Sequence, residues 1–197
     1  MNRALVHNRS GSGAAEFALV LPLLILFIFG LIDAGRFIWT WNRAEKAAQM
    51  GVRMAVVTDV LAGGLATYDY VGVGGLTQGD VIPVGAFGSI TCNSSGCSGT
   101  GTYPPVGTFN SASFNRIVAR MQAFAPEIPA ANVSVTYSGS GLGYAGDPNG
   151  MQISPLVTVS VSSIPFPLLS SLRIFGTNIT GVSATLTAED SSGTQSN

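Results

Sequence analysis

The sequence predicts an α+β fold: a long N-terminal helix, membrane-spanning at first and amphipathic later, packed on a small antiparallel sheet. Three observations predict it. An uncharged apolar run stands near the N-terminus, small residues at helical spacing follow, and alternating apolar and polar residues fill the C-terminal half. The 197 residues carry 9 basic and 10 acidic side chains and have a mean hydropathy of +0.40. This composition excludes a disordered chain and argues against a nucleic-acid binder.

The apolar run covers residues 17–32 and lies between Glu16 and Asp33. With its flanking alanines it has about the 20 residues that a helix needs to cross a bilayer. Core helices of soluble proteins are rarely apolar around their whole circumference for that length. We therefore predict a membrane-spanning helix over 12–35, in which Pro22 is tolerated with a slight kink.

The helix is predicted to continue outside the membrane over residues 36–61. One of its faces carries small side chains at spacings of three and four: Ala44, Ala47, Ala48, Gly51 and Ala55. Another face carries Arg36, Arg43, Lys46 and Arg53. We interpret the small face as packed on the chain's own globular part and the basic face as solvated, with contacts to other subunits as the alternative. Trp39 and Trp41 are typical of an interfacial aromatic belt.

The rest of the chain is predicted to be an extracytoplasmic α+β domain with glycine-rich loops over 62–188, followed by a polar tail over 189–197. A helix is expected to begin at a Ser111 or Ser113 cap and to end before Pro126. Period-two alternation and turn residues predict the other elements: strands at 80–86, 88–92, 133–137, 153–162 and 181–188, and a short helix at 166–172.

The two cysteines, Cys92 and Cys97, enclose a short Asn-Ser-Ser-Gly loop. This spacing favours a disulfide in an oxidising compartment, and therefore a C-terminal part outside the cytoplasm. Without a further Cys or a partnering His they cannot form a zinc site, so we expect no metal site.

No active site and no cofactor site is predicted. The single histidine, His7, lies near the N-terminus and is remote from every predicted folded segment, which argues against Ser-His-Asp catalysis. The run from Gly141 to Gly146 matches G-x-G-x-x-G, but turn residues follow where a dinucleotide site requires a helix. We interpret it as a hairpin loop and expect no enzymatic activity.

The first eleven residues are basic and allow three interpretations. They are a leader that is removed while the span is retained, the cytoplasmic end of an uncut anchor, or the start of a secretory signal. A cut after Gly11 would make Ser12 the new terminus and Glu16 its fifth residue. A cut after Gly13 would make Glu16 the third residue.

The segment from Gly11 through Glu16-Phe17 to Pro22 resembles the N-terminus of TadE-like pseudopilins, which belong to the tight-adherence (Tad, or Flp) branch of type IV pilus systems. Asp33 and the Gly-Arg-Phe sequence at 35–37 are similar to the family's exit from the membrane, and weaker similarity returns at 165–169 and 182–185. The resemblance implies a pilin-like fold and cleavage after Gly11 by a prepilin peptidase at the cytoplasmic membrane face, with the helix retained. Gly13 departs from the expectation, because glycine disfavours the first turn of a helix.

The resemblance further implies a non-enzymatic minor pseudopilin that assembles into, or primes, an adhesive pilus. Its expected partners are the prepilin peptidase, other pilins and minor pseudopilins, the inner-membrane assembly platform and membrane lipid, without nucleic acid. The N-terminus would lie in the cytoplasm of a bacterium and the C-terminal domain in the periplasm. Alternatives are a membrane-tethered binding module with an uncut anchor and a secreted enzyme with a cleaved signal.

The expected processing residues are therefore Gly11, Ser12, Glu16 and Phe17, and the expected assembly residues of the helix are Glu16, Pro22, Asp33 and Arg36. In a bundle of such helices the Glu16 carboxylate can pair with the terminal ammonium of a neighbour. Each charge then reduces the desolvation cost of the other, and the pairing sets the axial register between subunits.

Overall fold

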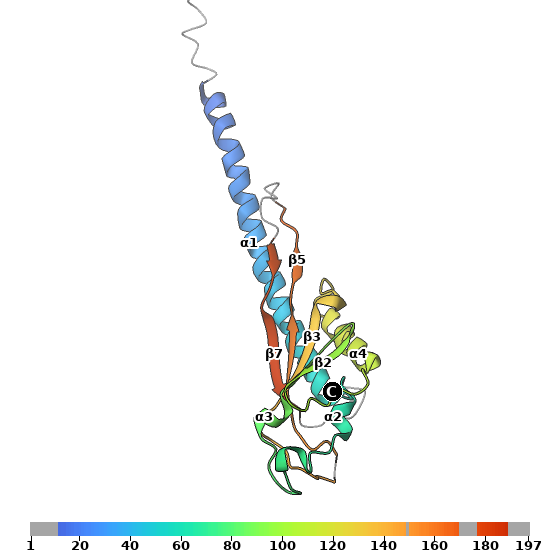
Figure 1. The fold of residues 1–197 in the computed structure, drawn as a ribbon. Coiled ribbons are helices and arrows are strands. Elements are labelled where there is room, and N and C mark those ends of the chain that lie inside the picture. The colour runs from blue at the N-terminus through green and yellow to red at the C-terminus, as the bar shows by residue number, and fades with distance from the viewer. Residues whose placement is uncertain (1–11, 149, 170–176, 189–197) are drawn as a thin grey trace, which may run out of the picture. The chain divides into compact units, whose positions relative to one another are not determined.

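The computed structural model describes residues 12–148, 150–169 and 177–188. It confirms the α+β class, because helix α1 (Ser12–Val57) is followed by a small antiparallel sheet (Figure 1). The described residues divide into two compact units. Unit 1 holds α1 up to Trp39 together with the segment 166–169 and Thr177, and unit 2 holds residues 40–165 and 178–188.

The elements after α1 are short. The helices are α2 (Gly64–Thr67), η2 (Val73–Gly75), α3 (Val84–Phe87), α4 (Ser111–Gln122) and η3 (Ala130–Asn132). The strands are β1 (Ser89–Asn93), β2 (Gly96–Thr100), β3 (Val133–Ser138), β4 (Leu156–Val161), β5 (Ile164–Phe166), β6 (Thr177–Ile179) and β7 (Val182–Thr187).

Five strands form one sheet in the order β2-β1-β3-β4-β7, with every neighbouring pair antiparallel, while β5 and β6 form a second sheet. One face of the larger sheet is buried and apolar, with Val135 and Val159 fully covered. Hydroxyl side chains occupy the other face, and their register aligns a row formed by Thr91, Thr136, Thr158 and Thr185. Hydroxyls in this row pair across strands at 3.0 and 2.8 Å.

The second half of α1 packs in the core of unit 2 through its small face. All five predicted residues of that face are buried: Ala44, Ala47, Ala48, Gly51 and Ala55. A β-carbon at Gly51 would lie 2.7 Å from Cγ of Met121 and 3.4 Å from Cγ1 of Val159, so a small residue is required there. The prediction that this face packs on the chain's own globular part is confirmed.

The basic face of α1 is only partly solvated. Lys46 and Arg53 are exposed, as predicted. Arg43 is half-buried instead: its Nε donates to the carbonyl oxygen of Phe124 at 3.0 Å, and its guanidinium lies 3.4 Å from the Glu127 carboxylate. Arg43 therefore links α1 to the end of α4.

Helix α4 presents its predicted apolar face to the core, but its cap differs from the prediction. Asn110, rather than Ser111 or Ser113, caps the helix, and its Oδ1 accepts a hydrogen bond from the backbone N–H of Ser113 at 3.1 Å. Asparagine is as effective a cap as serine, and the helix begins one residue after it.

Two predicted elements are wrong. Residues 80–86 do not form a strand: Val81 makes a single bridge to Tyr144, and α3 begins at Val84. Pro83 explains the difference, because it cannot donate to a strand ladder but suits a helix start. The predicted helix at 166–172 is also absent from its described part, since Phe166 ends β5 and residues 167–169 are irregular. Pro167 restricts the preceding residue to an extended conformation.

The sequence predicted only the first strand of the hairpin that β1 and β2 form. The structure adds β2 as its second strand. Gly88, just before β1, has φ +71°, a left-handed conformation that glycine adopts without strain. A β-carbon there would collide with the carbonyl oxygen of Thr100, at the end of β2. The hairpin thus closes too tightly at this end for any larger residue.

Candidate processing and assembly site

The first half of α1 presents apolar side chains all around the helix. An 18-residue window has a mean hydropathy of 2.6, and none of it is buried against the rest of the chain. Within the described ranges, α1 is the one helix that is long and apolar enough to cross a membrane. A core helix of a soluble protein would be mostly covered, so this exposure is typical of a lipid-facing surface.

The predicted processing residues lie at the beginning of this exposed segment. Gly11 is outside the described residues, and Ser12 is the first residue of α1. Glu16 lies four residues later, one turn along the helix, and is exposed. Phe17, 62% exposed, extends into the surroundings. Glu16 is the one acidic residue of α1 before Asp33, so it is isolated from other carboxylates along the helix.

Pro22 lies inside α1, and the helix continues through it without a break. Its ring nitrogen has no hydrogen to donate, so the backbone carbonyl of Ala18 loses its usual helical partner. In a lipid-exposed helix such a carbonyl is available to groups on neighbouring helices.

Asp33, with 5% exposure, is the most buried polar residue among those of unit 1 that the structure describes. Its carboxylate accepts hydrogen bonds from the Arg36 guanidinium at 3.0 Å and from the backbone N–H of Leu169, at 2.9 Å to Oδ1 and 3.1 Å to Oδ2. A buried carboxylate is costly unless such donors surround it. Asp33 therefore joins the end of the apolar run to a segment far along the chain.

Arg36 strengthens the same connection. Its guanidinium donates to the carbonyl oxygen of Pro167 at 3.3 Å and lies 5.3 Å from the centre of the Phe166 ring. Phe166 in turn makes an edge-to-face contact with Phe37, with the ring centres 5.5 Å apart. We call Asp33, Arg36, Phe37 and the segment 166–169 the Asp33 cluster.

Sequence reasoning selected Asp33 and Arg36 but missed their partners. The hydrogen bonds to Pro167 and Leu169 join residues 131 and 136 positions apart. A helix was predicted at 166–172. In a helix the backbone N–H of Leu169 would donate to a helical carbonyl or to water, so a bond to Asp33 was not expected. The resemblance of 165–169 to the family's later pattern was the one available signal.

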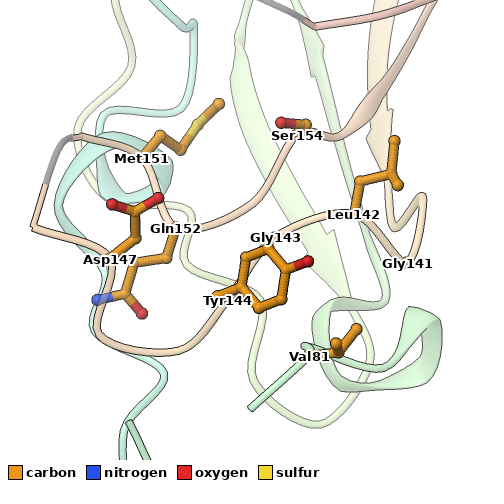
Figure 2. A pocket seen from close by; sticks show the side chains of 9 residues that line it. All are labelled: Val81, Gly141, Leu142, Gly143, Tyr144, Asp147, Met151, Gln152 and Ser154. Atoms are coloured by element: carbon orange, nitrogen blue, oxygen red, sulfur yellow. The ribbon is translucent and has the colours of Figure 1, made fainter. Parts of the chain in front are cut away.

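Unit 2 contains a pocket of about 310 Å³, lined by Val81 and by residues of the loop between 141 and 154 (Figure 2). The loop follows β3 and forms turns and isolated bridges up to Asp147, rather than the helix that a dinucleotide site requires. In the part of the chain that the structure describes, no three His, Cys, Asp or Glu side chains gather as a metal site would require. The side chains that line the pocket are apolar, hydrogen-bonding and, at Asp147, acidic.

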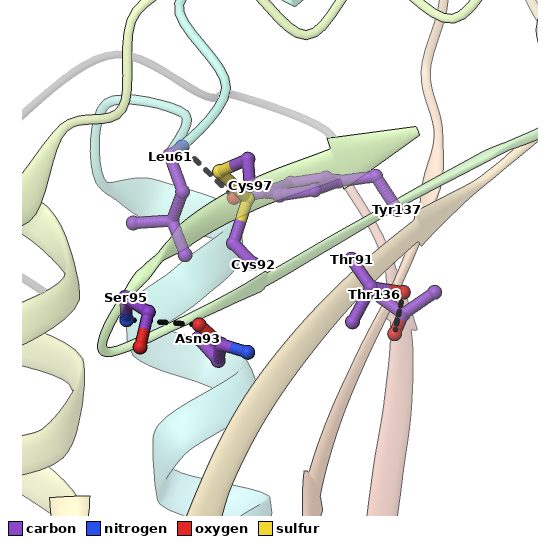
Figure 3. Close-up of a disulfide and its surroundings, with 8 residues drawn as sticks. All are labelled: Leu61, Thr91, Cys92, Asn93, Ser95, Cys97, Thr136 and Tyr137. Atoms are coloured by element: carbon purple, nitrogen blue, oxygen red, sulfur yellow. Dashed lines mark hydrogen bonds between the residues drawn. A yellow bond between two sulfur atoms is a disulfide. The ribbon is translucent and has the colours of Figure 1, made fainter. Parts of the chain in front are cut away.

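A disulfide joins Cys92 of β1 to Cys97 of β2, with α-carbons 4.0 Å apart (Figure 3). The two residues are directly opposite in the antiparallel register, and the turn between them is closed by a hydrogen bond from the N–H of Ser95 to Oδ1 of Asn93 at 2.8 Å. Disulfides persist in oxidising compartments.

Tyr137, on β3 near this hairpin, connects the sheet to the chain that follows α1. Its hydroxyl oxygen accepts a hydrogen bond from the backbone N–H of Leu61 at 3.1 Å (Figure 3). Burial, slightly opposed by this hydrogen bond, raises the pKa of Tyr137 to about 12. The tyrosine is therefore neutral at physiological pH, and its hydroxyl acts as a structural hydrogen-bond acceptor.

These features define a class of protein: a membrane-anchored chain with an N-terminal apolar helix and an extramembrane α+β unit. The family model described as TadE-like protein matches residues 11–53. This segment is therefore TadE-like, and the resemblance expected from the sequence is confirmed. The match indicates that this segment is of the kind found in proteins associated with the Tad pilus. Comparisons with curated proteins and with solved structures give no match.

Proposed function

We propose that this chain is a minor pseudopilin of a Tad pilus. A prepilin peptidase cuts after Gly11 at the cytoplasmic face of the inner membrane, and the mature chain begins at Ser12. The retained helix assembles with other pilins into the pilus or primes its assembly, while unit 2 lies in the periplasm.

One observation carries this proposal: the TadE-like match begins at residue 11, directly before the first residue of α1, and the first half of that helix is apolar and uncovered. An anchor that only tethers a domain needs no particular residue at this point. A subunit that is cut and then packed against other helices needs a processing site directly before the helix and side chains available to its neighbours. The exposed Phe17 and the other apolar side chains supply such a surface.

Glu16 supports a role in assembly through its electrostatics. A carboxylate at the centre of a membrane-spanning helix costs about 2.5–3.5 kcal/mol on insertion scales, and less near the interface. Cleavage creates an ammonium group at Ser12 of each copy, and pairing it with Glu16 of a neighbour offsets part of that cost. Because the pairing fixes one residue against one terminus, it defines the axial register of two helices.

The disulfide supports the proposed topology. Cys92 and Cys97 are bonded in unit 2, which is expected for a domain that folds in the periplasm. The N-terminal residues before α1 would then remain on the cytoplasmic side, where prepilin peptidases cut.

The test is the N-terminus of the protein extracted from native membranes, determined by mass spectrometry. The wild type and a Gly13→Lys variant are expected to begin at Ser12, whereas Gly11→Lys is expected to remain uncut and to be absent from pili. A terminus at Met1 or Asn2 in the wild type would support a tethered binding module instead. A terminus after the apolar run would indicate a secretory signal.

A second experiment tests the assembly role of Glu16. Glu16→Leu is expected to insert into the membrane and to be cut, but to crosslink to other pilins at least tenfold less than the wild type. Glu45→Gln, a change at an exposed acid on the same helix, is the matched control and is expected to crosslink normally. Normal incorporation of Glu16→Leu would refute the pairing of Glu16 with a neighbouring terminus.

A further inference from the structure

Charges are segregated in unit 2. Its five basic residues all lie on two helices: Arg43, Lys46 and Arg53 on α1, and Arg116 and Arg120 on α4. Residues 54–115 and 121–165 contain no Lys or Arg at all. The loops in those ranges carry aspartates instead. Apart from Glu45, which directly precedes Lys46 on α1, the helices of unit 2 carry basic charges and its loops carry acidic ones.

The acidic region surrounds a group of exposed apolar side chains. Val71, Val81, Val84, Leu142 and Tyr144 are each between 43% and 57% exposed, which is unusual for so many large apolar residues in a unit of this size. They are neighbours in space: Val81 bridges Tyr144, and both line the pocket with Leu142. A β-carbon at Gly141 would lie 3.1 Å from Cγ2 of Val84, so Val84 adjoins the same loop.

Three aspartates lie at the edge of this group. Asp147 lines the pocket itself, and Figure 2 shows it with Gln152 on one side of Tyr144, with Val81 and Leu142 on the other. Asp80 directly precedes Val81 in the chain. Asp69 accepts a hydrogen bond from Gln152 at 3.0 Å. We call the five apolar residues and these three aspartates the acid-rimmed patch.

Two of the aspartates are fixed in their ionised form. Asp69 accepts hydrogen bonds from the backbone N–H of Val71 and from Gln152, and these bonds hold its pKa below the usual value. Asp80 accepts from the backbone N–H and the hydroxyl of Thr77, at 2.7 and 2.8 Å, with the same effect on its pKa. Both carboxylates are thus held in place and charged at physiological pH.

The basic residues that remain exposed lie on α1 and α4. Lys46 and Arg53 are seven residues apart on α1, and therefore on one face of the helix, and both are exposed. Arg116 is exposed on α4. Arg43 already contacts Glu127. We call Lys46, Arg53 and Arg116 the basic helical surface.

We propose that the acid-rimmed patch of one copy docks on the basic helical surface of a second copy. Both halves of the contact occur on the same chain, at different places, and have opposite charge, which favours a head-to-tail contact between identical chains. Two patches facing each other would bring six aspartates together, so a symmetric patch-to-patch dimer is disfavoured. The apolar side chains supply the buried area, and the charges set the orientation.

The first test is site-specific photocrosslinking with the full-length protein in neutral phosphatidylcholine liposomes. Tyr144→p-benzoylphenylalanine is placed in ¹⁴N protein and mixed with ¹⁵N protein, so that mass spectrometry identifies links between copies. Links to peptides of α1 around 46–53 or of α4 are expected, with a several-fold lower yield in 1 M salt than in 0.15 M salt, because salt screens the contact. Links from patch to patch, or no links between copies, would overturn the proposal.

The second test adds positive charge to the acid-rimmed patch in one variant and reverses charges of the basic helical surface in another. A patch variant with Val84→Lys and Leu142→Lys, and a helix variant with Lys46→Glu and Arg53→Glu, are each expected to lose crosslinking at least tenfold. An equal mixture of the two is expected to regain it, because the unchanged patch of the helix variant can then meet the unchanged basic helical surface of the patch variant. The charge-retaining pair Lys46→Arg and Arg53→Lys is expected to crosslink like the wild type.

Failure of the mixture to regain crosslinking would overturn the proposal. So would links in native membranes that join position 144 only to a different protein. Neither test depends on cleavage at Gly11, so its outcome is independent of the proposed processing. A failed crosslink with correct processing would remove the head-to-tail contact and leave the pseudopilin proposal intact.

Discussion

Replacing Asp33 tests whether the Asp33 cluster holds the segment 166–169 on α1. The carboxylate accepts one hydrogen bond from Arg36 and a bifurcated one from the N–H of Leu169. A hydrogen bond to a charged group contributes about 1.5–3 kcal/mol. If Asp33→Ala loses this contribution at Leu169, the Leu169 amide should exchange with solvent about 10–150 times faster, since about 1.4 kcal/mol corresponds to a factor of ten.

The assay is amide hydrogen exchange of the full-length protein in lipid nanodiscs, followed at Leu169. Asp33→Asn retains an oxygen acceptor without the charge and should give an intermediate rate. Arg36→Gln leaves the bond from Leu169 to Asp33 in place and should accelerate exchange less than Asp33→Ala does. Glu45→Gln, outside the cluster, should have no effect. A Leu169 exchange rate that changes less than twofold in Asp33→Ala would refute the role assigned to this carboxylate.

Three further predictions concern unit 2, each measured by chemical denaturation of the full-length protein. Tyr137→Phe should cost about 1–3 kcal/mol at pH 7, because it leaves a buried N–H unpaired. Since the folded pKa is about 12 and the unfolded value is 10.0, the wild type should lose about 2–3 kcal/mol as the pH rises from 10 to 12, a loss that this variant lacks. Gly88→Ala should cost more than about 2 kcal/mol, whereas Gly85→Ala, which meets nothing within 4 Å, should be neutral or slightly stabilising. Removing the disulfide with Cys92→Ala and Cys97→Ser should cost about 2 kcal/mol, as expected for a loop closed across five residues. Equal stability of variant and wild type would refute the corresponding prediction.

The helices and central strands could be predicted because their signals are local. Small residues such as Ala47 and Gly51 recur at helical spacing, and Val133, Val135 and Tyr137 alternate with polar residues along β3. In both cases the period of the pattern is the period of the backbone, so the buried face is readable from the sequence alone.

The parts that could not be predicted depend on contacts between distant residues or on single prolines. Strand β2 has the sequence Gly-Cys-Ser-Gly-Thr, with almost no apolar alternation, and it is held by its pairing with β1 and by the disulfide. Leu169, the backbone partner of Asp33, is 136 residues away from it, and a backbone N–H leaves no trace in the side-chain pattern. Pro83 overrode an otherwise plausible strand.

The two-faced composition of the large sheet has a mechanical consequence. If a strand slid by a single residue against its neighbour, its hydroxyls would turn toward α1 and its valines toward water. Each hydroxyl moved inward without a new partner would cost about 1–3 kcal/mol, and several would move together. Sliding of one strand past its neighbour is therefore opposed at every residue pair. The sheet should keep its register when a force is applied along its strands.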